Sequence, residues 1–286
     1  MNENIVRSEY DMTSHRPLEM TKQHIMAAFR QKAFIPFITA GDPTISDTER
    51  YIDTMAQAGA DMIEIGIPFS DPVAEGPVIQ RASERALQGG LKIDHIFAMV
   101  KRLRQGKDQR AALTIPLILM TYINPIVVYG KERFFSACAD AGIDGVIVPD
   151  CPFEEKGELI EAAHACGVCV ISMIAPTSKN RIEMIASEAE GFIYCVSSLG
   201  VTGMRGHIQT DLPTIVSTIR QYTNIPVAIG FGISNPAQAK TMASVADGAI
   251  VGSALVAIVA DKGSQADAAI HDYVSTMKAA VEEANT

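Results

Sequence analysis

The stretch from Asp61 to Pro77, which reads DMIEIGIPFSDPVAEGP, decides the fold prediction for this chain. It begins with an apolar, isoleucine-rich run that predicts a buried β-strand, and a loop of proline, glycine and polar residues follows. Pro77 then opens a predicted helix, because the N–H that proline lacks would have no partner in the first helical turn. Three carboxylates, Glu64, Asp71 and Glu75, lie in the strand and the loop. Parallel α/β barrels carry their chemistry at this end of a strand.

The same alternation of strand and helix extends over the rest of the chain. The predicted strands cover residues 33–39, 62–67, 115–121, 145–148, 168–174, 191–196, 226–229 and 247–251. They are continuous apolar runs, as expected of parallel strands that are covered on both faces. About eight strands, each followed by a helix, predict an α/β fold that closes into a (β/α)8 TIM barrel. A doubly wound open sheet is the alternative, but Gly41 stands alone where that fold usually has a glycine-rich dinucleotide turn.

We expect a single catalytic domain over residues 18–286, since no change in composition marks a linker. An extra helix over residues 18–32 precedes the first strand, and a long amphipathic helix over residues 267–284 ends the chain. Residues 122–130 are predicted to be a loop. Residues 1–17 are polar and predict a flexible N-terminal arm without the apolar core of a signal peptide. No apolar run reaches the ~18 residues that a membrane span needs.

Composition and charge narrow the class of protein. The net charge of -9 and the pI of about 5.2 argue against nucleic-acid binding through charge, because an acidic surface repels phosphate backbones. Five cysteines, an odd number in a long chain, indicate reduced thiols and a cytoplasmic location. Cys166 and Cys169 have the spacing of a redox pair, but we interpret them as small apolar residues, because no second pair completes a zinc site. The six histidines are scattered without ligand spacing, so no metal site is predicted.

Glu64 is the first candidate for catalysis. Side chains alternate along a strand, so Glu64 points into the barrel mouth if Ile63 and Ile65 pack against the helices. Loss of hydration there would raise its pKa toward the range useful for proton transfer. The alternative is a buried carboxylate paired with a cation, but the stretch itself contains no basic residue. Glu75 is the second candidate acid, whereas Asp71 lies between two turn signals and is equally well explained by bonds to its own backbone.

Glycines at the ends of the last two predicted strands indicate an anion site. The seventh strand ends at Gly230-Phe231-Gly232, and the eighth ends at Gly252-Ser253. Glycine lets backbone N–H groups approach an anion, and the start of the following helix adds favourable partial charge. TIM barrels commonly bind phosphate at this place. Each glycine alone is better explained as a turn residue, but their occurrence in consecutive units favours the phosphate site.

The loop after the sixth predicted strand has the composition of a mobile lid. Residues 197–206 read SSLGVTGMRG, with three glycines and several small polar side chains. Within it, Thr202 can bond a carboxylate when the lid is closed, and Gly203 can offer its N–H. Tyr194, just before the loop, either lines the pocket or belongs to the core, and the sequence does not separate these alternatives.

Six segments of the chain carry a resemblance to a known family. They are PFITAGDP at 36–43, IEIGIPFSDP at 63–72, EGPVIQ at 75–80, SLGVTG at 198–203, GFGIS at 230–234 and GSALV at 252–256. In this order they resemble the tryptophan synthase alpha chain family, and the resemblance runs from about residue 20 onward. It implies a (β/α)8 barrel that acts as a carbon–carbon lyase in L-tryptophan biosynthesis. The implied reaction is the retro-aldol cleavage of indole-3-glycerol phosphate to indole and glyceraldehyde 3-phosphate.

The resemblance also implies partners and site residues. This chain would need no cofactor, and the indole would pass to a tryptophan synthase beta chain that holds pyridoxal phosphate, in an α2β2 heterotetramer. The family's catalytic glutamate falls on Glu64 and its second catalytic acid on Glu75, where the commoner residue is aspartate. The family's other site positions are a pocket tyrosine, a lid threonine, four phosphate contacts and an indole wall, which fall on Tyr194, Thr202, Gly203, Gly232, Gly252, Ser253 and Phe231.

Other functions stay open at this point. An isomerase of the same pathway would keep the phosphate glycines, but the acid pair and the GVTG loop fit it less well. A stand-alone lyase that releases indole is a second alternative. The longer side chain of Glu75 leaves open a third, a non-catalytic subunit that activates another chain, because small geometric changes matter at such sites.

Overall fold

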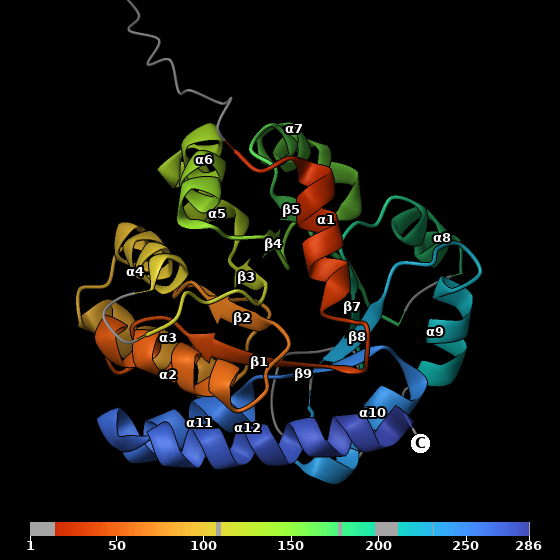
Figure 1. Ribbon diagram of the computed structural model, residues 1–286. Coiled ribbons are helices and arrows are strands. Elements are labelled where there is room, and N and C mark those ends of the chain that lie inside the picture. The colour runs from red at the N-terminus through yellow and green to blue at the C-terminus, as the bar shows by residue number, and fades with distance from the viewer. Residues whose placement is uncertain (1–14, 107–109, 177–178, 198–210, 231, 286) are drawn as a thin grey trace, which may run out of the picture.

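The computed structural model describes residues 15–106, 110–176, 179–197, 211–230 and 232–285, and it shows a ring of helices around a parallel sheet (Figure 1). The strands are β1 (Ala33–Thr39), β2 (Ile63–Gly66), β3 (Leu117–Met120), β4 (Gly145–Ile147), β5 (Cys169–Val170), β6 (Ser172–Ile174), β7 (Ile193–Val196), β8 (Val227–Gly230) and β9 (Gly248–Val251). Their order in the sheet is β5-β4-β3-β2-β1-β9-β8-β7-β6. All pairs are parallel, so the predicted TIM barrel is confirmed.

The count of nine strands comes from a break in the fifth predicted strand. Residues 168–174 form two short pieces, β5 and β6, which Ile171 separates. β5 pairs with β4, whereas β6 pairs with β7 on the other side. The two pieces are consecutive in the chain and stand at the two ends of the sheet order, so together they close the barrel.

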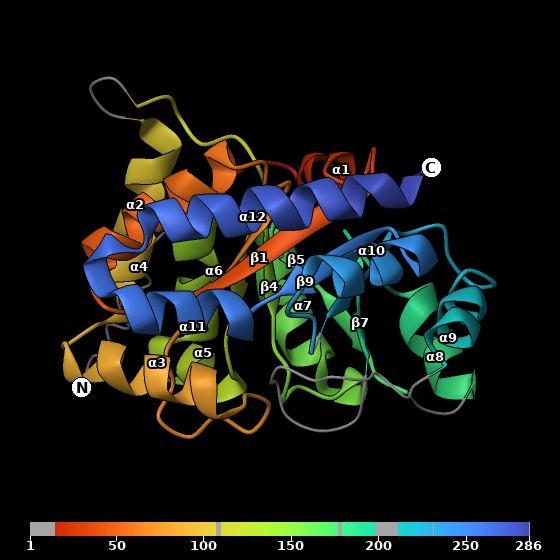
Figure 2. The same cartoon turned by 90° about the horizontal axis from the view of Figure 1, so that it is seen from below.

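The helices lie outside the sheet, except for the first. They are α1 (Leu18–Ala27), α2 (Ile45–Gln57), α3 (Pro77–Gln88), α4 (Ile93–Gln105), α5 (Ile123–Tyr129), α6 (Lys131–Ala141), α7 (Gly157–Ala165), α8 (Lys179–Ser187), α9 (Leu212–Ile219), α10 (Pro236–Val245), α11 (Ser253–Lys262) and α12 (Asp267–Glu282). The last helix, α12, runs across the outside of the barrel from α10 to α2 (Figure 2). Within the described ranges, no helix is long and apolar enough to cross a lipid bilayer.

The helix prediction was wrong at one place and incomplete at another. The predicted loop 122–130 contains α5, a short helix whose Ile126 is buried in the core. The helix expected after Gly252-Ser253 is α11, whose bounds were not predicted because an apolar run without helical periodicity does not reveal them. That helix contacts α3, α12 and β1, so it is covered on several sides and needs no polar face.

The core has two layers, one between sheet and helices and one inside the barrel. The inner layer contains Phe37, Met120 and Ile147 from the strands and also Ile25 from α1. The predicted extra helix is therefore present, and α1 closes the end of the barrel where the strands begin. The loop between β2 and α3 lies at the opposite end (Figure 2). The site must be sought at that second end, where the strands finish.

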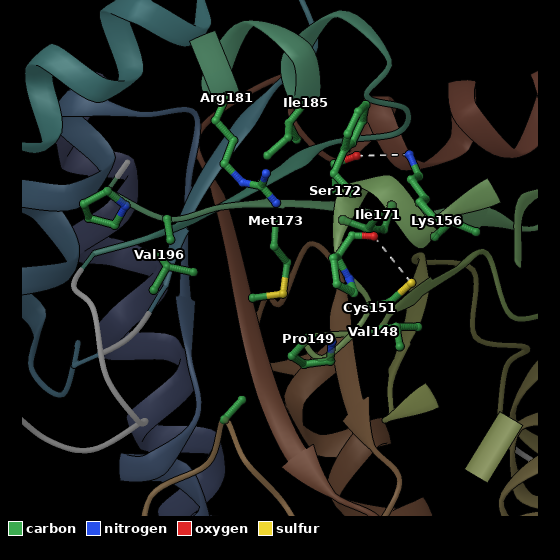
Figure 3. A pocket seen from close by; sticks show the side chains of 16 residues that line it. Val148, Pro149, Cys151, Lys156, Ile171, Ser172, Met173, Arg181, Ile185 and Val196 are labelled. Atoms are coloured by element: carbon green, nitrogen blue, oxygen red, sulfur yellow. Dashed lines mark hydrogen bonds between the residues drawn. The ribbon is translucent and has the colours of Figure 1, made fainter. Parts of the chain in front are cut away.

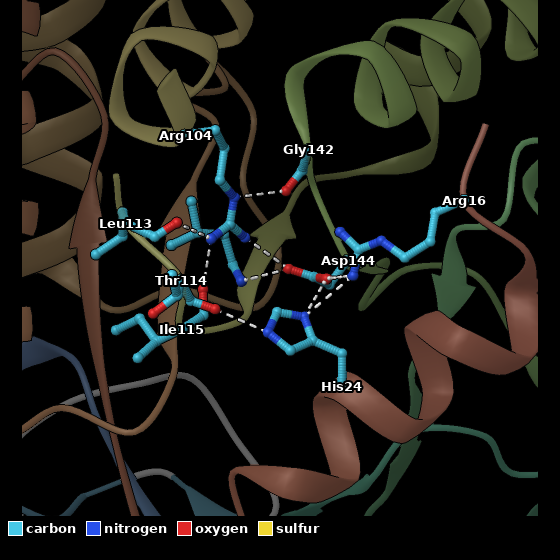
Figure 4. Close-up of polar contacts among 9 residues, drawn as sticks. Arg16, His24, Arg104, Leu113, Thr114, Ile115, Gly142 and Asp144 are labelled. Carbon is cyan, nitrogen blue, oxygen red and sulfur yellow. Dashed lines mark hydrogen bonds and ion pairs between the residues drawn. The ribbon is translucent and has the colours of Figure 1, made fainter. Parts of the chain in front are cut away.

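A buried charge cluster holds α1 in place (Figure 4). The fully buried Asp144 accepts hydrogen bonds from Arg16 at 2.8 Å, from His24 at 2.7 Å and from Arg104 at 2.7 Å. Burial alone would raise the pKa of Asp144, but the hydrogen bond from His24 and the charges of Arg104 and Arg16 lower it below its ordinary value. Arg16 belongs to the end of the predicted arm; residues 1–14 lie outside the described part, so the flexible arm stays a prediction.

Candidate active site

Six of the predicted site residues line one small cavity at the end of the barrel where the strands finish. It has a volume of about 30 Å3, and its walls include Glu64, Glu75, Tyr194, Gly232, Gly252 and Ser253. The remaining lining is apolar and consists of Phe37, Ile79, Met120, Ile233 and Ile250. Three further predicted site residues, Thr202, Gly203 and Phe231, lie outside the described residues. The residues that the sequence predicted for the site thus come from five separate parts of the chain and meet at one cavity.

Glu64 lies inside the barrel and is 2% exposed. Its strand neighbours are Phe37 and Ile118, both of the inner core layer, which shows that the predicted orientation of Glu64 is correct. Burial and the negative charge of Glu75 raise the pKa of Glu64 to about 8. In the described part of the chain no cation lowers it. A carboxyl group with this pKa can both donate and accept a proton near neutral pH.

Glu75 is buried in the loop before α3, and polar partners fix it at two points. Its carbonyl accepts from Nε2 of Gln80 at 2.8 Å, and Oε2 of its carboxylate accepts from the hydroxyl of Tyr122 at 2.7 Å. Burial raises the pKa of Glu75, the Tyr122 hydrogen bond lowers it and the charge of Asp150 raises it, with a net rise. The sequence analysis missed Tyr122. Its position directly after the third strand, at the catalytic end of a barrel, was the available signal.

The glycine end of the cavity has the geometry of an anion site. α11 begins at Ser253, whose side chain lines the cavity, and the first N–H that bonds back into this turn is that of Val256, to the carbonyl of Gly252. The N–H groups before it are therefore available to a ligand. Gly232 has a φ of 80°, which favours glycine, and a Cβ on Gly252 would lie 3.2 Å from the ring of Phe37.

Tyr194 on β7 and Gly230 on the neighbouring strand β8 depend on each other. A Cβ on Gly230 would lie 2.2 Å from the Tyr194 hydroxyl, so only glycine leaves room for this ring. Burial and the charge of Glu64 raise the pKa of Tyr194 well above its ordinary value. The phenol is therefore a neutral wall of the cavity next to Glu64. The sequence left open whether Tyr194 lines the pocket or belongs to the core. Both are true, since Tyr194 packs in the inner core and also lines the cavity.

Figure 3 shows a larger, mainly apolar cavity of about 400 Å3. Its walls include Pro149 after β4, Met173 on β6 and Val196 on β7. Val196 points the same way as Tyr194 two residues earlier, and Ala74, another wall residue, precedes Glu75. The two cavities share no lining residue, but Ala74 and Glu75 place their walls at consecutive positions of one loop. The sequence did not reveal the larger cavity, which lies beside the break between β5 and β6.

Comparison with known proteins agrees with this geometry. The family model described as the tryptophan synthase alpha chain matches residues 24–285. The chain belongs to the tryptophan synthase alpha chain family. It is 45% identical to the tryptophan synthase alpha chain of Lacticaseibacillus casei over 251 residues, which is 88% of this chain and 92% of that protein. It is 47% identical to that of Geobacillus stearothermophilus over 81% of this chain and 84% of that protein.

The solved structures give the same answer for the fold. The crystal structure of the tryptophan synthase alpha chain from Legionella pneumophila subsp. pneumophila superposes with a TM-score of 0.80 and 34% identity. The match covers 93% of this chain and 97% of that one. The reaction of the tryptophan synthase alpha chain family is the cleavage of indole-3-glycerol phosphate, so this chain is a carbon–carbon lyase of L-tryptophan biosynthesis. The alternatives of a stand-alone lyase and a non-catalytic subunit are not favoured.

Proposed function

We propose that Glu64 relays the proton in the retro-aldol cleavage of indole-3-glycerol phosphate. The reaction breaks the bond between C3 of the indole and the hydroxyl-bearing carbon of the glycerol chain. Glu64 first donates its proton to C3, and the carboxylate formed then removes the proton of that hydroxyl as the bond breaks. Indole and glyceraldehyde 3-phosphate leave, and Glu64 is protonated again. A pKa of about 8 for Glu64 suits both steps.

Glu75 is assigned the second role, that of stabilising charge. Protonation of C3 makes the indole nitrogen electron-poor, and a carboxylate that accepts a hydrogen bond from the N–H stabilises this positive charge. Glu75 lines the same cavity as Glu64 and lies next to the apolar space for the ring. Its side chain is one methylene longer than the commoner aspartate, and its two fixed points set where the carboxylate lies.

The phosphate of the substrate is assigned to the glycine end of the cavity. Gly232, Gly252 and Ser253 line it, and the start of α11 supplies N–H groups and favourable partial charge. We also assign Thr202 and Gly203 to a loop that closes over the substrate, and Phe231 to the wall against the indole. The observation that carries the whole proposal is that one cavity contains two buried glutamates and these glycines.

A beta chain is the proposed partner. Val73 in the loop after β2 and Val127 and Val128 on α5 are exposed by 69%, 55% and 79%. The two segments are neighbours, since the amide of Ala74 bonds to the hydroxyl of Tyr122. Exposed apolar side chains at the mouth of the barrel suit a partner that receives indole directly. We propose that this partner holds the pyridoxal phosphate, that this chain needs no cofactor, and that the complex is an α2β2 heterotetramer.

A cytoplasmic location is proposed from the cysteines. All five lie in the described part of the chain and are free thiols: Cys138, Cys151, Cys166, Cys169 and Cys195. Reduced thiols are typical of the cytoplasm.

One assay tests the reaction and the role of Glu64 together. The purified chain, with and without a beta chain, is incubated with indole-3-glycerol phosphate, and glyceraldehyde 3-phosphate is measured. We expect cleavage that the beta chain accelerates, and a loss of at least about 100-fold in Glu64→Gln. The exposed Glu161→Gln is the matched control and should be fully active. Near-normal turnover by Glu64→Gln would rule out the proton relay.

A further inference from the structure

Tyr122 contacts both the carboxylate of Glu75 and the backbone next to it. The tyrosine is 1% exposed and lies at the start of α5, at the catalytic end of the barrel. Its hydroxyl donates to Oε2 of Glu75 at 2.7 Å and accepts from the amide of Ala74 at 3.0 Å. The ring of Phe69 packs against it with the centroids 5.2 Å apart. One hydroxyl therefore holds the side chain and the main chain of the same loop.

The direction of the first hydrogen bond is fixed by charge. Burial and the negative charge of Glu75 raise the pKa of Tyr122 far above its ordinary value, so the phenol keeps its proton. The hydroxyl must then donate to the carboxylate and use its lone pair for the Ala74 amide. The hydroxyl thus uses both its donor and its acceptor on this loop, which leaves the carboxylate of Glu75 little freedom to rotate.

We propose that Tyr122 is a positioning residue for the cleavage reaction: by binding Oε2 of Glu75 and the amide of Ala74, it directs Oε1 of Glu75 toward the N–H of the bound indole. The proposal rests on the function proposed above and gives a reason why a glutamate works in this position. Glutamate has one more rotatable bond than aspartate, so its carboxylate must be restrained to stay aligned. Gln80 fixes the backbone carbonyl at one end, and Tyr122 fixes the carboxylate at the other.

A role limited to stability makes different predictions. If the Tyr122 hydrogen bond were purely structural, its loss would change the unfolding free energy. It would change neither the preference for a ligand with an indole N–H nor the pH dependence of ligand binding. A positioning bond changes both, because its loss lets the carboxylate of Glu75 turn and removes the one contact among those described that lowers the pKa of Glu75. Burial and Asp150 then raise that pKa further.

The test compares Tyr122→Phe with Tyr51→Phe, a matched control on α2 in the core layer between the sheet and the helices. Tyr51 is equally buried, and its hydroxyl donates to the carbonyl of Gly263 beyond the C-terminal end of α11. Calorimetry measures binding of 3-indolepropanol phosphate and of its N-methyl derivative, which lacks the N–H. The unmodified chain and Tyr51→Phe should prefer the N–H ligand by about tenfold. Tyr122→Phe should lose most of this preference. The pH below which its affinity for the N–H ligand falls should also be higher than in the unmodified chain.

Turnover and a second substitution complete the experiment. In Tyr122→Phe, KM should rise because the ground-state contact to the N–H is weakened, and kcat should also fall about tenfold, because the contact strengthens further as positive charge develops on the indole. In Glu75→Asp the shorter arm withdraws the carboxylate from Tyr122, so adding Tyr122→Phe should then change kcat little. If the unmodified chain cleaves its substrate and Tyr122→Phe equals Tyr51→Phe in ligand preference, kcat and pH profile, the positioning role is wrong. If the unmodified chain does not cleave it, the proposed function fails first and this role fails with it.

Discussion

Replacing Glu64 by glutamine should stabilise the fold while it abolishes cleavage, and the gain in stability should grow with pH. Glutamine has nearly the shape of glutamate but no proton to lose in this pH range. The folded chain of the unmodified protein must bury the Glu64 carboxylate at high pH, close to the negative charge of Glu75. The variant has no such charge. The difference in unfolding free energy between the two proteins therefore measures how much the buried carboxylate destabilises the fold.

The magnitude follows from the pKa of Glu64, about 8 in the folded chain against an ordinary value of 4.5. Because the folded value is raised, the stability from the protonated group is fully present below pH 4.5 and is lost as the pH rises through about 8. At about 1.4 kcal/mol per tenfold change in proton affinity, the full loss is about 5 kcal/mol. At pH 7, where Glu64 is still mostly protonated when folded, about 3 kcal/mol is already lost.

Urea unfolding at pH 5, 7 and 9, followed by circular dichroism, measures this difference. The unfolding free energy of Glu64→Gln minus that of the unmodified chain should rise by about 3–5 kcal/mol over this range. The control Glu161→Gln, an exposed side chain on α7, should show a difference near zero at every pH. A difference for Glu64→Gln that stays constant from pH 5 to pH 9 would refute the argument that burial raises the pKa of Glu64.

Three further outcomes are expected. First, kcat/KM for cleavage should fall as the pH rises through about 8, because the relay starts from protonated Glu64; a profile that instead rises there would contradict this order of proton transfers. Second, Asp144→Asn should lower the unfolding free energy in urea by about 3–5 kcal/mol, since it removes the fully buried anion from its partly buried cations, whereas the exposed Asp140→Asn should cost below about 1 kcal/mol. Equal effects would show that the cluster does not hold α1. Third, Val128→Asp should weaken binding of the beta chain in calorimetry at least about tenfold, whereas Met20→Asp, at another exposed apolar side chain on α1, should not. Unchanged binding by Val128→Asp would remove α5 from the proposed interface.

The barrel and most of its site were predictable because both are repeated patterns. Each strand is an apolar run that ends in turn residues, and parallel strands must end on the same side, so Glu64, Gly232 and Gly252 had to meet there. The direction in which Glu64 points followed from the alternation of side chains in one short strand. These inferences need only local periodicity and the rule that strand ends converge.

The missed features depend on contacts between distant segments. Tyr122 meets Glu75 across a separation of 47 residues, and its loop was assigned no helix because Gly130 and a proline within it read as turn signals. The apolar cavity beside Met173 lies where residues 168–174 pair with β4 over β5 but with β7 over β6, a change that no periodicity in these residues reveals. Helix α11 lacks a polar face because other elements cover it. Such features are decided by packing, after the local pattern has been fixed.

The environments of the two glutamates are what separate their roles. Burial raises the pKa of both, and at Glu64 the like charge of Glu75 raises it again, so Glu64 is the group that holds a proton at neutral pH. At Glu75 the hydroxyl of Tyr122 opposes burial and favours the ionised form. Two neighbouring carboxyl groups cannot both ionise without repulsion, so the anion settles on the one with a donor. The negative charge of Glu75 in turn keeps the proton on Glu64, so in the proposed relay Tyr122 would act on both acids although it bonds only one.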